Sequence, residues 1–146
     1  MAPDSELLEA AAVLHDVGYA PDLATSGFHP LDGARFLQMV DAPKRLVDLI
    51  AHHSYALLEA RMRGLEHDLA AFDDEGPSVV RDALWYCDIT TTPDGDATTG
   101  PQRIAEIKER YGPDSLVTQF ITEASPELLA AVNRTENRLR AAIASA

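Results

Sequence analysis

Residues 7–18 of this chain read LLEAAAVLHDVG, a stretch whose apolar side chains recur at helical spacing until Gly18. This spacing is typical of an amphipathic helix, and glycine is a common helix stop. Similar stretches, separated by glycine and proline, continue to the C-terminus, whereas strand-like alternation is nearly absent. We therefore predict an all-α fold, a single-domain helical bundle of about seven to eight helices over residues 1–146.

The ends of the helices are predicted from glycine, proline and capping residues. The third helix is expected to bend near the double histidine and to end at Gly64, and residues 91–100 are expected to form a loop. The expected helices cover residues 6–17, 29–40, 44–63, 77–90, 101–112, 113–125 and 126–145, with a further short segment at 65–72.

Composition limits the compartment and the partners. The chain has one cysteine, Cys87, so it forms no internal disulfide, and it lacks an apolar run long enough to cross a bilayer. The net charge of -12 disfavours nucleic acid and anionic membranes as partners. We expect a cytoplasmic protein that acts on a small anionic substrate. We expect the C-terminal helices to complete the core, to form the outer wall of a substrate cleft, or to pair with a second subunit. The last of these roles would make the protein a homo-oligomer.

The side chains that carry chemistry begin with His15 and Asp16, adjacent at the end of an apolar helix. An ionised aspartate at the edge of a core is costly unless it is paired or binds a metal. His29, His52 and His53 follow, and a mixed histidine and aspartate cluster can bind divalent metals without thiolates. A single buried histidine is more often a hydrogen-bonded core residue, which is the alternative here.

The two adjacent histidines, His52 and His53, are not equally good candidate metal ligands. Neighbours on a helix point about 100° apart, so His52 is the preferred ligand and His53 is alternatively a supporting or surface residue. His67 is expected at the surface. Asp88 lies in the apolar ALWYCDIT and is a further candidate ligand, unless it bonds to backbone donors near Thr90.

Three arginines are candidates for phosphate binding. Arg81 precedes Asp88 by seven residues and Arg45 precedes His52 by seven, which places each pair on about the same helix face. Arg61 follows His52 by nine residues. The alternative for each is a solvated surface arginine.

In order and spacing, four motifs resemble the HD-domain superfamily of metal-dependent phosphohydrolases. They are VLHDVG (13–18), HPLDGARFL (29–37), HH (52–53) and YCD (86–88), and they fall within residues 6–92, ahead of a helical extension at 100–146. The resemblance implies that His15, Asp16 and Asp88 hold a first metal. It implies that Asp16 bridges to a second metal held by His29 and His52, with His53 as a further candidate.

The resemblance also implies a reaction. One or two divalent metals (Fe, Mn, Ni, Co or Mg) would activate water for hydrolysis of a small phosphorylated metabolite or nucleotide, with Asp16 and Arg81 as catalytic residues. Arg45, Arg61 and Arg81 would contact the substrate. The alternatives are a dinuclear-iron oxygenase of the same family and a degenerate HD module without catalysis.

The chain departs from the family pattern in three places. The family's first histidine lies on a helix ahead of the doublet, and no histidine precedes His15 here, so we expect the usual first helix to be missing; the alternative is an open position on the first metal. Tyr19 stands where many hydrolytic members carry lysine. The Gly-Tyr-Pro signature of the cyclic-dinucleotide phosphodiesterases is absent after His53.

Overall fold

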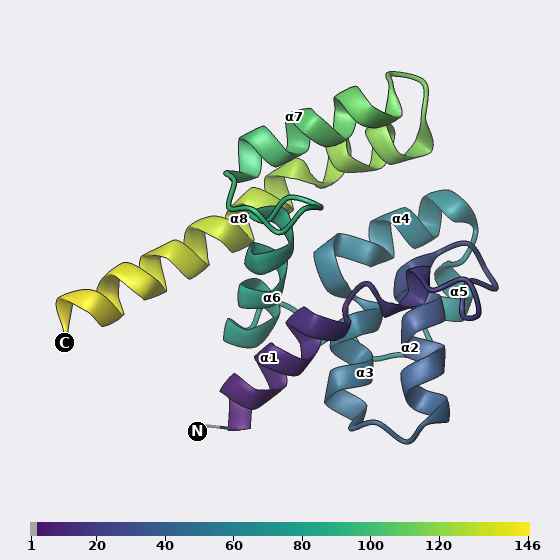
Figure 1. Cartoon of the computed structure of the whole chain (residues 1–146), viewed down its shortest axis with the longest axis horizontal. Helices are drawn as coiled ribbons and strands as arrows, with labels where there is room; N and C mark the ends of the chain where they lie inside the picture. The colour runs from purple at the N-terminus through teal and green to yellow at the C-terminus, as the bar shows by residue number, and fades with distance from the viewer. Residues whose placement is uncertain (1–2) are drawn as a thin grey trace. The chain divides into compact units, whose positions relative to one another are not determined.

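The computed structural model describes residues 3–146, and in that range the chain folds into eight α-helices and two short 3₁₀ turns (Figure 1). Within the same residues there is no β-strand, and an isolated bridge joins Thr91 to Ala97. The all-α prediction is therefore confirmed. The chain divides into two compact units, of which the first ends at Gly76 and the second starts at Pro77. The predicted domain range of 1–146 stays a prediction, and its residues 1 and 2 lie outside the described part.

The first unit carries most of the predicted ligands. Its core includes Phe28, Leu31 and Ile50, which are fully buried, and its helix α2 spans His29–Met39, α3 spans Lys44–Ala51 and α1 spans Pro3–Leu14. Helix α2 packs against α3 and the first 3₁₀ turn, and α1 packs against α3. The elements are α1 (Pro3–Leu14), η1 (Val17–Tyr19), α2 (His29–Met39), α3 (Lys44–Ala51), η2 (His53–Tyr55), α4 (Ala56–Arg63) and α5 (Glu66–Leu69).

The first helix ends earlier than the predicted Gly18. The α-helix stops at Leu14, a turn follows, and η1 begins at Val17. Gly18 lies so close to α2 that a Cβ on it would be 2.0 Å from the carbonyl oxygen of His29 and 2.6 Å from the nitrogen of Gly33. This close approach requires glycine at position 18, because any other residue would place a Cβ against the backbone of α2.

The predicted bend at the double histidine is confirmed. Helix α3 ends at Ala51 and α4 starts at Ala56. Between them Ser54 and Tyr55 have φ values of 49° and 59°, in the left-handed region that interrupts an α-helix. The helix beyond the break ends at Gly64, as predicted, with φ at 72°.

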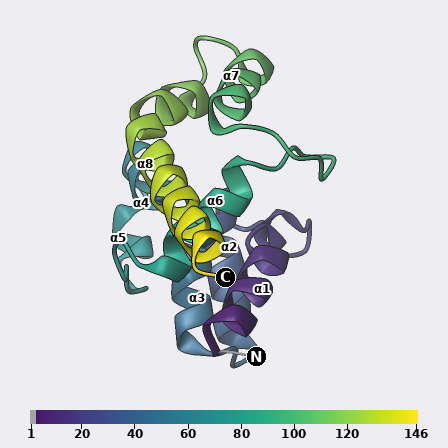
Figure 2. The same cartoon turned by 90° about the vertical axis from the view of Figure 1, so that its left-hand side faces the viewer.

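The second unit consists of α6 (Val79–Ile89), α7 (Gly100–Tyr111) and α8 (Leu116–Ala144), and α6 and α7 both pack against α8. Two separate helices were predicted at 113–125 and 126–145, and this prediction is wrong because α8 runs through Pro126. Proline removes one backbone hydrogen bond and bends a helix without having to end it. Figure 2 shows that α8 changes direction along its length.

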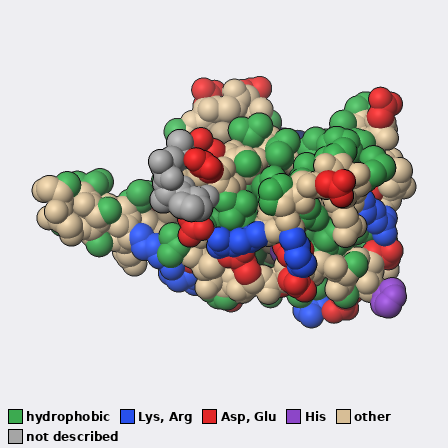
Figure 3. Space-filling model, turned by 90° about the horizontal axis from the view of Figure 1, so that it is seen from below, with side chains coloured by type: hydrophobic (Ala, Val, Ile, Leu, Met, Phe, Trp, Pro, Cys, Tyr) green, Lys and Arg blue, Asp and Glu red, His purple; other side chains and the backbone are tan. Residues whose placement is uncertain are grey.

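Ion pairs occupy much of the charged surface. Among the described residues Arg35 pairs with Asp68, and Lys44 pairs with Asp48 and Asp73. On the face in Figure 3, basic side chains lie beside acidic ones. None of the helices described between residues 3 and 146 combines the length and the apolar character that a membrane crossing requires.

Candidate metal centre

The turn after α1, the start of α2 and the break after α3 bring four predicted side chains together. The Asp16 carboxylate lies 3.3 Å from Nε2 of His15 and 3.4 Å from Nε2 of His29. Nε2 of His29 lies 3.1 Å from Nε2 of His53. Asp16, His29 and His53 each offer one ligand atom within 4.8 Å of the others, which is the spacing of residues that can share a metal ion.

Two of the imidazoles are oriented by backbone carbonyls. Nδ1 of His15 donates to the carbonyl of Ala12 at 2.8 Å, and Nδ1 of His53 donates to the carbonyl of Ile50 at 2.6 Å. A carbonyl oxygen only accepts, so the proton of each neutral ring lies on Nδ1 and Nε2 carries a lone pair. Both rings therefore present the atom that binds metals toward the cluster.

The contact between His29 and His53 fits a cation. Nε2 of His53 carries a lone pair, so it accepts a hydrogen bond when His29 has its proton on Nε2, and the two Nε2 atoms can share a metal ion when that proton is absent. Asp16 supplies the negative charge, and 57 % of its side chain is exposed, so the carboxylate is accessible from solvent. The donor set of imidazole and carboxylate suits Fe, Mn, Co, Ni or Zn better than Mg.

Sequence reasoning assigned no contact at this site to Tyr19 or Asp32. The Tyr19 ring stacks on His29, with ring centroids 3.9 Å apart and an angle of 16° between the planes. Asp32 is buried and accepts hydrogen bonds from Thr25 Oγ1 and Ser26 N, both at 3.0 Å. Burial raises the pKa of Asp32, but these bonds outweigh it and hold the pKa below its usual value. For Asp32 the available signal was the polar pair Thr25 and Ser26, a few residues before HPLDG.

The double histidine contributes to the cluster differently from the sequence prediction. His52 was the preferred ligand, yet the structure gathers His53 with Asp16 and His29. Nε2 of His52 instead bonds to the carbonyl of Phe72 at 2.9 Å, and its Nδ1 lies 3.9 Å from Asp74. His52 therefore holds the segment after α5. His67 is exposed on α5, as predicted.

The remaining candidates lie elsewhere in the chain. Asp88 lies on α6 in the second unit, and its role as a ligand stays a prediction. Arg45 pairs with Asp4 and Glu75, and Arg61 pairs with Glu66. These surface pairs agree with the alternative of solvated arginines.

Arg81 also has partners inside the second unit. It is 6 % exposed, contacts Asp82 at 3.1 Å and lies over the ring of Trp85, 3.9 Å from its centroid. Arg81 is therefore buried, not a solvated surface arginine, and its roles in catalysis and substrate binding stay predictions.

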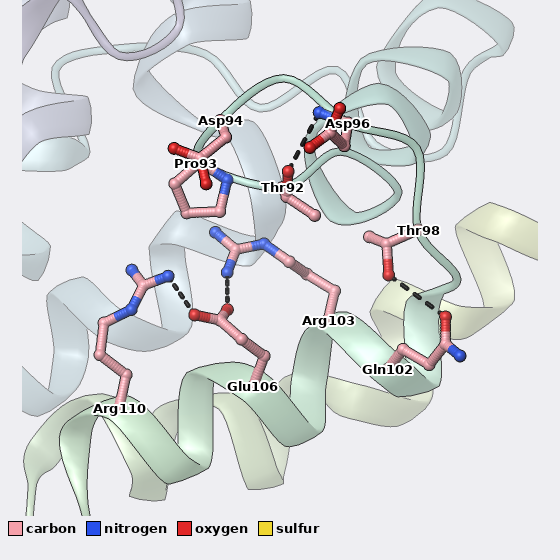
Figure 4. A pocket seen from close by; sticks show the side chains of 9 residues that line it. All are labelled: Thr92, Pro93, Asp94, Asp96, Thr98, Gln102, Arg103, Glu106 and Arg110. Carbon is pink, nitrogen blue, oxygen red and sulfur yellow. Dashed lines mark hydrogen bonds and ion pairs between the residues drawn. The ribbon is translucent and has the colours of Figure 1, made fainter.

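The second unit contains a polar cleft of about 500 Å³ between residues 92–98 and α7 (Figure 4). Arg103 and Arg110 both bond to Glu106 across its floor, and Thr98 contacts Gln102. Asp94 and Asp96 add further negative charge. Because acids outnumber the two arginines here, the cleft does not match a phosphate group.

Comparison of the chain with known proteins found one matching family model. The family model described as HD domain matches residues 1–87. The match includes His15, Asp16, His29, His52 and His53 and ends one residue before Asp88. No curated protein matched the chain, and no solved structure did.

Proposed function

The chain belongs to the HD-domain family, and from this premise we propose that it hydrolyses the phosphoester of a small phosphorylated metabolite or nucleotide. The family is one of metal-dependent hydrolases. The observation that carries the proposal is the convergence of Asp16, His29 and His53, whose ligand atoms lie within 4.8 Å of one another.

The proposed metal ligands are Asp16, His29 and His53, with His15 completing the set. A bound divalent cation would lower the pKa of a water molecule and polarise a phosphoryl oxygen. The carbonyls of Ala12 and Ile50 place the proton of each neutral ring on Nδ1, so Nε2 of His15 and of His53 is the nitrogen that can bind a metal. Asp16 presents a solvent-accessible carboxylate, which orients the attacking water. Asp88 is proposed as a further ligand on the family resemblance alone.

Metal analysis and a substrate screen test the proposal together. We expect protein purified without added metal to contain Fe, Mn, Co or Ni and to release phosphate from p-nitrophenyl phosphate or from a nucleotide. Asp16→Asn should lose metal and reduce turnover at least about a hundredfold, because it removes the charged ligand. His67→Gln is the matched control, since His67 is exposed on α5, and it should retain both metal and turnover.

Three experimental results would contradict or change the proposed function. Protein without metal that is inactive with every added divalent metal would contradict the proposal. Bound iron with oxygen consumption and no phosphate release would replace hydrolysis by an oxygenase reaction. Asp88→Asn with the metal content of the wild type would remove Asp88 from the ligand set and leave the other residues in place.

A further inference from the structure

A single buried carboxylate in the second unit receives three guanidinium groups. Asp82 on α6 is fully buried, and Arg134 on α8 contacts it through two nitrogens at 2.7 and 2.9 Å. Arg138 contacts the same carboxylate at 3.0 Å and Arg81 contacts it at 3.1 Å. We call Arg81, Arg134 and Arg138 the arginine triad.

The charges in this cluster do not balance. Burial raises the pKa of Asp82, but the bonds from Arg134, Arg138 and Arg81 outweigh it and bring the pKa to about 2, so the carboxylate is ionised at neutral pH. One negative charge therefore faces three positive ones. Glu127 acts on Arg134 from the same helix, but it is exposed and therefore screened by solvent. A positive excess remains, in a chain whose net charge is -12.

The arginine triad also has a buried hydrogen-bond donor that no acceptor within residues 3–146 satisfies. Each oxygen of Asp82 accepts two of the four bonds, so the carboxylate has no acceptor site left. Nε of Arg81 is buried and meets no acceptor among the described residues. Burying a guanidinium donor without a partner is costly. The positive charge of Arg81 is therefore only partly offset by its bond to Asp82, and an anion at the two outer arginines would offset it further.

The triad is reachable from solvent on the side of α8. The side chain of Arg81 is 8 % exposed, whereas those of Arg134 and Arg138 are 36 % and 39 % exposed. The buried arginine therefore supplies a fixed charge, and the two outer arginines supply accessible donors. Planar guanidinium groups match the oxygens of a phosphate in a bidentate fashion.

We propose that the arginine triad binds a phosphate group, either inorganic phosphate or the terminal phosphate of a small metabolite. The site is distinct in its residues from the histidine cluster and does not depend on the proposed hydrolase activity. The polar cleft at Arg103 and Arg110 is a weaker candidate, because its acids outnumber its arginines.

Isothermal titration of inorganic phosphate into the full chain tests the site, with a chelator present so that no metal contributes. We expect saturable binding to the wild type, and Arg138→Gln should weaken it about tenfold or more because a charged hydrogen-bond donor is lost. Arg140→Gln removes the same charge two residues away, from a side chain that bonds to Asn137 instead of Asp82, and should retain the affinity of the wild type.

A second measurement uses the wild type alone. In ¹⁵N spectra of the arginine side chains, phosphate should shift the Nε resonance of Arg81, and sodium chloride at equal ionic strength should not. Adenosine monophosphate in a parallel titration distinguishes a phosphorylated metabolite, which would bind more tightly, from phosphate alone. Absence of phosphate binding, equal binding by Arg138→Gln, or an unshifted Arg81 resonance would each overturn the proposal.

Discussion

His52 and His53 are adjacent in the chain, but only His53 reaches the candidate metal centre. The sequence predicted that the two side chains diverge, and they do. It could not predict which one faces the cluster, because the answer depends on the end of α3 at Ala51 and on the left-handed residues Ser54 and Tyr55. Non-glycine residues adopt positive φ rarely, so helical spacing was the wrong guide at this position.

This difference predicts separate effects for the two histidines. His53→Ala should lose most of the bound metal, because it removes a buried ligand. His52→Ala should keep the metal content but lower the free energy of unfolding by about 1–3 kcal/mol, because the bond to the Phe72 carbonyl is lost. Elemental analysis and urea denaturation of both variants check this. Loss of metal from His52→Ala alone would contradict the assignment.

At the scale of elements, helical spacing predicted most of the fold, and the errors lie at turns and at one proline. Buried residues of α8 continue in helical phase across Pro126, from Phe120 and Ala124 to Leu128 and Ala131. That phase is present in the sequence, but proline is also common in the first turn of a helix, so the sequence alone favours a new helix at Pro126. Burial on both sides of Pro126 offsets the missing hydrogen bond. The close approach of Gly18 to α2 is a tertiary contact, so local spacing does not predict it.

The packing of η1 on α2 predicts a strong effect of Gly18→Ala. The added Cβ would lie 2.0 Å from the carbonyl oxygen of His29, so the turn that carries His15 and Asp16 has to move. We expect the free energy of unfolding to fall by about 2 kcal/mol or more and the metal content to fall with it.

Gly27→Ala is the control variant for the predicted effect of Gly18→Ala. Its Cβ would meet nothing within 4 Å, although its φ of 77° makes alanine strained by about 1 kcal/mol. This variant should therefore keep its metal. Equal metal content in both variants would show that the close approach at Gly18 does not position the cluster.

At the scale of the whole molecule, the sequence located the motifs but not the long-range ion pairs. Arg134 and Arg138 lie 52 and 56 residues after Asp82, and nothing in their local spacing indicated a partnership. The division of the chain at Gly76 was also not predicted, because the helices on both sides have similar composition. Tertiary pairing of charges depends on how helices pack, which local patterns do not encode.

The Asp82 cluster makes stability depend on acid pH in a defined direction. The pKa of Asp82 is about 2 in the folded chain against 3.8 in the unfolded one, so the folded state binds fewer protons. Its stabilisation is complete above about pH 4 and is lost as the pH falls toward 2, and it amounts to about 2 kcal/mol. The pKa of Asp32 is also lowered and acts in the same direction.

Urea denaturation between pH 7 and pH 2 measures this dependence through the Asp82→Asn variant. At pH 7 this variant should be less stable than the wild type by about 3 kcal/mol or more, because three arginines lose their shared carboxylate. The difference should narrow by about 2 kcal/mol as the pH falls from 4 to 2, because the wild-type carboxyl group is then protonated. Parallel curves would contradict the lowered pKa. Asp32→Asn tests the lowered pKa of Asp32 separately and leaves the arginine triad intact. Its difference from the wild type should also narrow as the pH falls.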